Sequence, residues 1–330
     1  MKVGLISPQG WKMEYAGWEP AAAWARTVEL AKQAEALGFE SLWVFDHFTT
    51  VPEPTDEMTL ESFSQLSALA MVTERVRLGH MVICTAFRNP ALTAKLASTI
   101  DVISGGRFEI GIGAGWKKDE WIAYGYGFPP IGERISTFEE HLEVITRMIA
   151  PGHATYKGER VHVIDAINEP RSIQEKIPLI VGGNGRVRTA GLAVKFADEL
   201  NWVFKGPAFV AERMPEVKAM CEAAGRNPDT LRFSMYTYDE DFSEPGQKRV
   251  DYLGEFNESG LDRLVCFPTK YDPSLDPVLR VGIWGNAPLT RIRAVAEDVL
   301  KRFADLQLAE TVFPLFLKSD LGMHFRDDRP

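Results

Sequence analysis

Residues 78–120 read LGHMVICTAFRNPALTAKLASTIDVISGGRFEIGIGAGWKKDE, and this stretch decides the fold. It opens with an apolar strand and continues into a helix expected to start at Asn89-Pro90 and to stop at SGG, residues 104–106. A second strand follows and ends in GIGAGW, residues 111–116. Polar and glycine-rich residues therefore collect at the strand ends, where parallel α/β proteins bind their ligands.

Strands and helices alternate in the same way along the rest of the chain. Short apolar runs predict eight strands, at Val3–Ser7, Glu40–Phe45, Val76–Val82, Phe108–Ile112, Ile177–Gly182, Glu199–Val203, Leu231–Tyr238 and Leu261–Phe267. Between them, apolar residues recur at three- and four-residue steps, as in residues 135–149 and 292–303, which is typical of amphipathic helices. The pattern predicts an α/β fold, a TIM (β/α)8 barrel with insertions.

We expect residues 1–330 to form this barrel as a single domain, because α/β barrels exceed 250 residues without dividing. Residues 151–176 predict an insertion before the fifth strand, and residues 268–288 a long loop after the eighth. The alternative is a doubly wound open sheet. Its phosphate-binding fingerprint should follow the first strand, but the sequence there is PQGW, residues 8–11.

Composition excludes several classes of protein. The net charge of −9 and the lack of a basic run argue against nucleic-acid binding. Three cysteines without metal-like spacing indicate a reduced chain, and no leader or long apolar run is apparent, so we expect a cytoplasmic protein that does not bind membranes. The six histidines show no HxH or HExxH spacing, which predicts no metal site.

Two candidate site segments follow predicted strands. Asp46-His47 ends the second strand, and a histidine exchanges protons readily near neutral pH, although an isolated pair of this kind more often caps a loop. Residues 182–186, GGNGR, follow the fifth strand and open a helix. Backbone N–H groups at such a turn form an anion site for a phosphate.

Three segments, GFESLWVFDHF (38–48), LGHMV (78–82) and residues 87–120, resemble the luciferase-like monooxygenase superfamily, in particular its deazaflavin (coenzyme F420)-dependent oxidoreductases. The likeness extends in element order from about Met1 to about Leu308 and is strongest over residues 38–134. It implies a bacterial luciferase-like barrel that binds F420, or FMN as the alternative. It also implies a homodimer.

The resemblance assigns roles to particular residues. It implies that His47 and Asp46 are catalytic, with His47 contacting the deazaflavin and moving a proton. It implies a non-proline cis peptide at Met81-Val82 behind the central ring of the flavin. The further cofactor-binding residues that it implies are Asp46, His80, Met81, Val82, Gly113, Trp116, Asp119, Gly182, Gly183, Asn184, Gly185 and Arg186.

One departure from the family pattern bears on the substrate. Trp116 stands where sugar-phosphate members carry a polar acid or amide, so we expect an apolar or aromatic substrate. The polyglutamyl tail of F420 requires positive charge around its pocket. The basic residues predicted on the ligand side are Arg88, Lys117, Lys118, Arg186, Arg188 and Lys205.

These observations favour an F420-dependent oxidoreductase that transfers a hydride between the deazaflavin and a small organic substrate. Three alternatives remain open at this point. They are a monooxygenase of the same fold that uses reduced FMN, a glycosidase-type barrel that pairs Asp46 with Glu240 or Asp241, and a protein that sequesters the cofactor without turnover.

Overall fold

The computed structural model describes residues 1–51, 53–237 and 247–266. Four predicted features lie outside these residues: the strand ends at Tyr238 and Phe267, the carboxylates Glu240 and Asp241, the loop at 268–288 and the helix at 292–303. Nothing tests the single-domain boundary, which stays a prediction.

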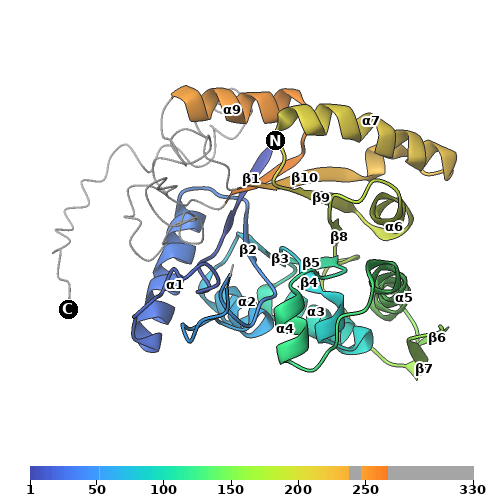
Figure 1. The fold of residues 1–330 in the computed structure, drawn as a ribbon, viewed down its shortest axis with the longest axis horizontal. Helices are drawn as coiled ribbons and strands as arrows, with labels where there is room; N and C mark the ends of the chain where they lie inside the picture. The colour runs from blue at the N-terminus through green and yellow to red at the C-terminus, as the bar shows by residue number, and fades with distance from the viewer. Residues whose placement is uncertain (52, 238–246, 267–330) are drawn as a thin grey trace.

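Eight parallel strands form a closed barrel, which confirms the predicted (β/α)8 architecture (Figure 1). They are β1 (Lys2–Ile6), β2 (Ser41–Val44), β3 (Arg77–His80), β5 (Phe108–Gly113), β8 (Leu179–Gly182), β9 (Glu199–Val203), β10 (Arg232–Thr237) and β11 (Arg263–Cys266). Each strand pairs with the next in this order, and β11 returns to β1 with Lys2 opposite Arg263. The open-sheet alternative is therefore wrong.

Helices surround the strands (Figure 1). They are α1 (Pro20–Ala36), α2 (Ser62–Val72), α3 (Pro90–Ser104), α5 (Ile131–Ile149), α6 (Arg188–Phe196), α7 (Pro207–Ala223) and α9 (Gln247–Glu258), with short elements α4 (Lys118–Ala123), η1 (Thr85–Phe87) and η2 (Pro228–Thr230). Within residues 151–176, β6 (Ala154–Lys157) and β7 (His162–Ala166) form an antiparallel hairpin separate from the barrel. No helix in the described part of the chain has the length and apolar character needed to cross a membrane.

The helix α3 shows how the sequence sets element boundaries. The side chain of Asn89 accepts a hydrogen bond from the Ala91 N–H, and Pro90 occupies the first helical position, where no N–H is needed. Gly105 ends the helix with φ of 68°, a left-handed conformation that glycine adopts without steric penalty. Both helix boundaries agree with the prediction from the sequence.

The third strand differs from its prediction over Val76–Val82. It ends at His80, and the peptide bond between Met81 and Val82 is cis, as the resemblance implied. The chain then forms β4 (Ile83–Cys84), which pairs with β5. The predicted strand is therefore two residues too long at its carboxyl end, and a second short strand that was not predicted follows the cis bond.

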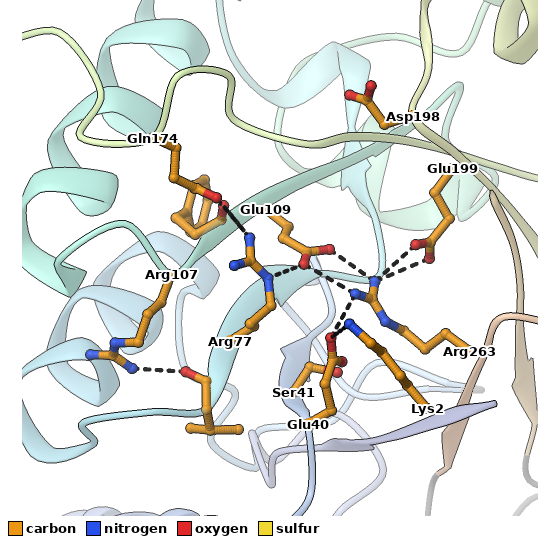
Figure 2. A network of polar contacts seen from close by, with 12 residues as sticks. Lys2, Glu40, Ser41, Arg77, Arg107, Glu109, Gln174, Asp198, Glu199 and Arg263 are labelled. Atoms are coloured by element: carbon orange, nitrogen blue, oxygen red, sulfur yellow. Dashed lines mark hydrogen bonds and ion pairs between the residues drawn. The ribbon is translucent and has the colours of Figure 1, made fainter. Parts of the chain in front are cut away.

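A network of buried charges fills the barrel near the amino ends of the strands (Figure 2). Arg263 on β11 donates to Glu109 at 2.8 and 3.1 Å, to Glu199 at 3.0 and 3.1 Å, and to Glu40 at 3.1 Å. Arg77 also contacts Glu109. Burial disfavours ionisation of Glu109, but the charges of Arg263 and Arg77 outweigh it and lower the pKa of that carboxyl. Such networks at the amino end of a barrel serve stability.

Candidate active site

A cavity of about 430 Å³ opens at the carboxyl ends of the barrel strands. Most of its wall is apolar or aromatic, formed by residues that include Trp11, Phe45, Met81, Val82, Trp116, Phe204 and Tyr236. A concave, largely apolar pocket with few polar groups is the usual form of a small-molecule site. Its position at the carboxyl ends of the strands agrees with the placement predicted from the sequence.

The predicted glycines Gly113 and Gly182 flank one side chain of the cavity wall. A Cβ atom added to either glycine would lie 2.9 Å from a methyl group of Val82. The residue after the cis bond therefore occupies the space that these two glycines leave free. The resemblance assigned both glycines to the cofactor, whereas in the protein they first accommodate Val82.

His47 lies in the cavity wall with its imidazole held on three sides. Its Nδ1 is 2.8 Å from Oε2 of Glu120. The ring stacks on Trp11 with centroids 4.8 Å apart, and the edge of Trp116 meets it at 5.7 Å. Within the residues that the structure describes, no hydrogen bond is made by Nε2 of this imidazole. One nitrogen is thus anchored, and the other has no protein partner there.

Glu120 connects helix α4 to the loop that carries His47. Its Oε1 accepts hydrogen bonds from the N–H groups of Phe48 and Thr49, at 2.8 and 3.0 Å, and from the Thr49 hydroxyl at 3.2 Å. Burial opposes ionisation of this carboxyl, but the contacts with His47 and with these backbone N–H groups outweigh it and lower the pKa of Glu120. Glu120 is therefore a buried, anionic acceptor.

Asp46 lines the cavity beside His47, but donors surround its carboxylate. It accepts from the Cys84 N–H at 2.8 Å, from the Ser62 hydroxyl at 2.9 Å and from Arg88 at 2.7 Å. Arg88 also contacts Glu61 at 2.7 Å. These bonds tie the end of β2 to β4 and α2, so the geometry favours a positioning role for Asp46.

Cys84 borders the cavity as a buried thiol rather than a reactive one. Burial raises the pKa of this thiol to about 12. A thiol with that pKa is protonated at neutral pH and is a poor nucleophile. Its contribution to the site is therefore packing at the cavity wall.

Of the predicted site residues that follow β5, Trp116 lines the cavity and Asp119 does not. Trp116 borders the cavity with 62% of its surface exposed, so it forms part of the mouth. Asp119 pairs with Lys117 and does not line the cavity, whereas its neighbour Glu120 does. The structure thus brings Trp116 to the predicted site and places Asp119 beside it.

The glycine-rich segment after β8 curves beside the cavity. Gly182 and Gly183 line it, and the Asn184 side chain makes two hydrogen bonds of 2.9 Å with the backbone of Val203 on β9. Thr189 leaves no room for a Cβ at Gly185, because that atom would lie 2.4 Å from the threonine hydroxyl. Among the described residues, the backbone N–H groups of residues 185–188 have no hydrogen-bond acceptor, so they remain available to an anion.

The basic residues predicted on this face are mostly paired. Arg186 contacts Glu216 on α7, and Arg188 donates to the Gly132 carbonyl at 2.9 Å and the Ser136 hydroxyl at 3.0 Å. Lys117 and Arg88 are bound to Asp119 and Asp46, as above. Less unpaired positive charge therefore lies near the cavity than the number of basic residues indicated.

His80 is separated from the cavity. Its ring is fully buried between Phe63 and Phe108, with centroids 4.3 and 5.8 Å away. Neither ring nitrogen has a hydrogen-bond partner in the described part of the chain. Burial, together with the charge of Arg88, lowers the pKa of His80 well below its ordinary value. Its side chain is therefore a neutral packing element, and only its backbone lies near Val82.

Sequence reasoning missed Glu120 as the partner of His47. The only available signal was the pair Asp119-Glu120, and successive helical residues point about 100° apart, so one of them had to face away. Which one faces the histidine depends on where α4 begins, and that is set by tertiary packing. Within the described residues, no group of three or more His, Cys, Asp or Glu side chains could hold a metal ion.

Comparison with known proteins places the chain in a family. Residues 1–238 match the model of the luciferase-like monooxygenases. The chain is 31% identical over 257 residues to the pyrimidine monooxygenase RutA of Stutzerimonas stutzeri, an alignment that covers 73% of this chain and 69% of that protein. It is 28% identical over 211 residues to the F420-dependent glucose-6-phosphate dehydrogenase of Amycolatopsis mediterranei. That alignment covers 62% of this chain and 61% of that protein.

A solved F420-dependent secondary alcohol dehydrogenase, bound to an F420-acetone adduct, has the same fold. It superposes with a TM-score of 0.70 at 19% identity and covers 89% of this chain and 98% of its own. The family match covers well over half of the sequence, and RutA is similar over more than two thirds of it. The chain belongs to the luciferase-like monooxygenase family.

Proposed function

We propose that this protein is an F420-dependent oxidoreductase that transfers a hydride between the deazaflavin and a small apolar or aromatic substrate. Membership of a family of enzymes that act on small molecules supports an enzymatic role. The observation that carries the finer proposal is the His47–Glu120 pair in the cavity wall. A hydride that leaves or enters carbon beside an oxygen requires a proton acceptor or donor at that oxygen, and an imidazole provides both.

The residues around the cavity fit the cofactor. The deazaflavin would lie against Met81, Val82, Gly113 and Gly182, where the wall is apolar and without bulky side chains. Its phosphate would bind the free N–H groups of residues 185–188, at the start of α6. When bound, F420 supplies a carbon centre that accepts or donates a hydride.

Among the other predicted residues, we assign indirect roles. Asn184 shapes the anion-binding turn through its bonds to Val203, and Arg186 adds positive charge nearby although it is paired with Glu216. Asp46 holds the segment after β2, which carries His47, in place through its hydrogen bond from the Cys84 N–H. His80 and Asp119 remain predictions as cofactor contacts, with side chains that do not line the cavity.

The proton transfer is assigned to His47. Its Nε2 would take a proton from a substrate hydroxyl, or return one to a carbonyl, on the side of the ring away from Glu120. The aromatic walls formed by Trp116, Phe204 and Tyr236 favour an apolar or aromatic alcohol or ketone.

A second candidate is a monooxygenase that uses reduced FMN. Two observations favour it: the similarity to RutA, which is named as a pyrimidine monooxygenase, and the pairing of most basic residues near the cavity. A cofactor with a single phosphate and no polyglutamyl tail requires less positive charge than F420. The two candidates share the fold and the cavity, so the cofactor distinguishes them.

A binding titration separates these candidates. We expect F420 to quench the fluorescence of Trp11, Trp116 and Trp121, which all line the cavity, and to saturate at a concentration at least about tenfold below that of FMN. Replacing Trp116 with leucine provides a control, because it should reduce the quenching amplitude by removing the most exposed of the three indoles. Tighter binding of FMN than of F420 would contradict the F420-dependent function and favour the monooxygenase.

We also propose a cytoplasmic homodimer. The free, buried thiols of Cys84, Cys221 and Cys266 suit a reducing compartment. Large apolar side chains are exposed on two adjacent helices, Met71 on α2 and Leu92, Val102 and Ile103 on α3. Such a surface favours self-association.

Sedimentation velocity tests the dimer. The 36.9 kDa chain should sediment as a species of twice that mass, and Met71→Glu combined with Ile103→Glu should convert it to a monomer, because both charges would be buried in the interface. The exposed Ile167, which lies beyond the β6–β7 hairpin, offers a matched control, since Ile167→Glu should leave the mass unchanged. A wild-type chain that sediments as a monomer contradicts the proposal.

A further inference from the structure

We propose that Glu120 is a positioning residue that holds His47 in the tautomer protonated at Nδ1, so that Nε2 carries the lone pair. The assignment of a proton-transfer role to Nε2 rests on the proposed function. The tautomer itself is a property of the protein without cofactor or substrate.

The hydrogen bond between the two side chains determines which of them carries the proton. An ionised carboxylate has only acceptor sites, and a neutral imidazole carries one N–H. Because Glu120 is anionic and its Oε2 lies 2.8 Å from Nδ1, the proton of that bond belongs to Nδ1. Nε2 is then an acceptor, without a hydrogen-bond partner in the described part of the chain.

The carboxylate of Glu120 is itself held in a fixed orientation. Oε1 is occupied by three donors, the N–H groups of Phe48 and Thr49 and the Thr49 hydroxyl. These donors fix the plane of the carboxylate and leave Oε2 for His47. The helix α4 is thus bonded to three consecutive residues of the loop after β2, and the imidazole is the first of them.

The other nearby charges do not provide this contact. Asp46 is directed at Cys84, Ser62 and Arg88, and Asp119 is paired with Lys117. Trp11 and Trp116 hold the plane of the imidazole but offer no acceptor to Nδ1. Among the described residues, Glu120 is therefore the carboxylate that selects the tautomer.

The substitution Glu120→Gln tests this selection with little change in shape. The three donors at Oε1 would retain the amide oxygen of the glutamine, which turns its NH2 group towards Nδ1. Nδ1 would then have to accept a hydrogen bond, and the proton would move to Nε2. The variant is thus expected to reverse the tautomer while it keeps the loop in place.

Nitrogen NMR of the cofactor-free protein, labelled with ¹⁵N-histidine, measures the tautomer directly. The His47 signals are identified by their loss in His47→Asn. We expect a protonated Nδ1 in the wild type and a protonated Nε2 in Glu120→Gln. Glu140→Gln is the matched control, because Glu140 on α5 also accepts two backbone N–H groups, those of Arg160 and Val161 in the β6–β7 turn, and does not line the cavity. A wild-type signal with the proton on Nε2, or a tautomer unchanged in Glu120→Gln, overturns the proposal.

Kinetics provide the second readout. With F420 and 1-phenylethanol, Glu120→Gln should lower kcat by at least about a hundredfold and change KM by less than about threefold, since substrate binding is retained while the acceptor at Nε2 is lost. If Glu120→Gln fails to fold, Glu120→Asp keeps the charge and should keep the wild-type tautomer. A failure of F420 to bind would end the proposed function but leave the NMR result standing, so the two outcomes are distinguishable.

Discussion

Replacing His47 with asparagine should lower kcat by about 10²–10⁴-fold while the dissociation constant of F420 changes by less than about threefold. Asparagine retains a polar side chain that can bond to Glu120, so the loop should stay in place. It cannot carry a proton at neutral pH. The visible absorbance of F420, followed with 1-phenylethanol and related alcohols, measures kcat, and tryptophan quenching measures cofactor affinity.

The control for this experiment is His153→Asn. His153 is half-exposed on the β6–β7 hairpin and is bonded to Asp165 at 2.8 Å, so its loss removes an imidazole–carboxylate pair far from the cavity. Turnover should not change in that variant. Wild-type turnover in His47→Asn would show that this imidazole is not the proton carrier. A loss of F420 affinity equal to the loss of kcat would show instead that it binds the cofactor.

The barrel was predictable because its signals are local. Each strand is a short apolar run that ends in glycine or polar residues, and helix caps such as Asn89 and Gly105 occur next to the elements they bound. The division of residues 76–84 into β3 and β4 was not predictable, because the apolar pattern continues through the cis bond. The periodicity of apolar residues indicates which residues are buried, but it does not indicate whether a peptide bond is cis or trans.

The position of the site was predictable, but the side-chain contacts within it were not. A histidine at a strand end was expected to face the cavity, and His47 does. His80 ends the neighbouring strand, but its ring packs between Phe63 and Phe108 instead. Side chains alternate along a strand, so a residue at the carboxyl end faces either the cavity or the surrounding helices, and the exact strand end decides which.

Charge was the least predictable property. The sequence gives the number of basic residues on the ligand face, but it does not show that Arg88 is bound to Asp46 and Glu61, or that Arg186 is bound to Glu216. These partners are 27 or more residues away along the chain. Ion pairs between distant segments form only when the closed barrel brings those segments together, so the sequence alone does not reveal them.

The buried charge network should make stability sensitive to the loss of Arg263. Arg263→Met removes the guanidinium that Glu109, Glu199 and Glu40 share, and it leaves two nearly inaccessible carboxylates close to each other (Figure 2). Breaking a buried ion pair on one side costs about 3–5 kcal/mol. Glu109 would keep Arg77 and Glu199 would keep Arg232, but both carboxylates would lose the guanidinium that they share. We expect the free energy of unfolding at pH 7, measured with urea, to fall by about that amount.

Acidification provides an independent check of this cause. The pKa of Glu109 is lowered by Arg263 and Arg77 against the effect of burial, so its contribution to stability is complete above the ordinary glutamate pKa and declines as the pH falls. The gap in unfolding free energy between wild type and Arg263→Met should therefore narrow as the pH falls below the ordinary glutamate pKa of about 4.3. Arg147→Met is the control, because Arg147 is half-exposed and its pair with Glu143 contributes less than about 1 kcal/mol. The guanidinium of Arg263 also lies over the ring of Trp43, 5.1 Å from its centroid. If the difference in unfolding free energy stays constant with pH, the destabilisation comes from the loss of this packing and not from the loss of charge.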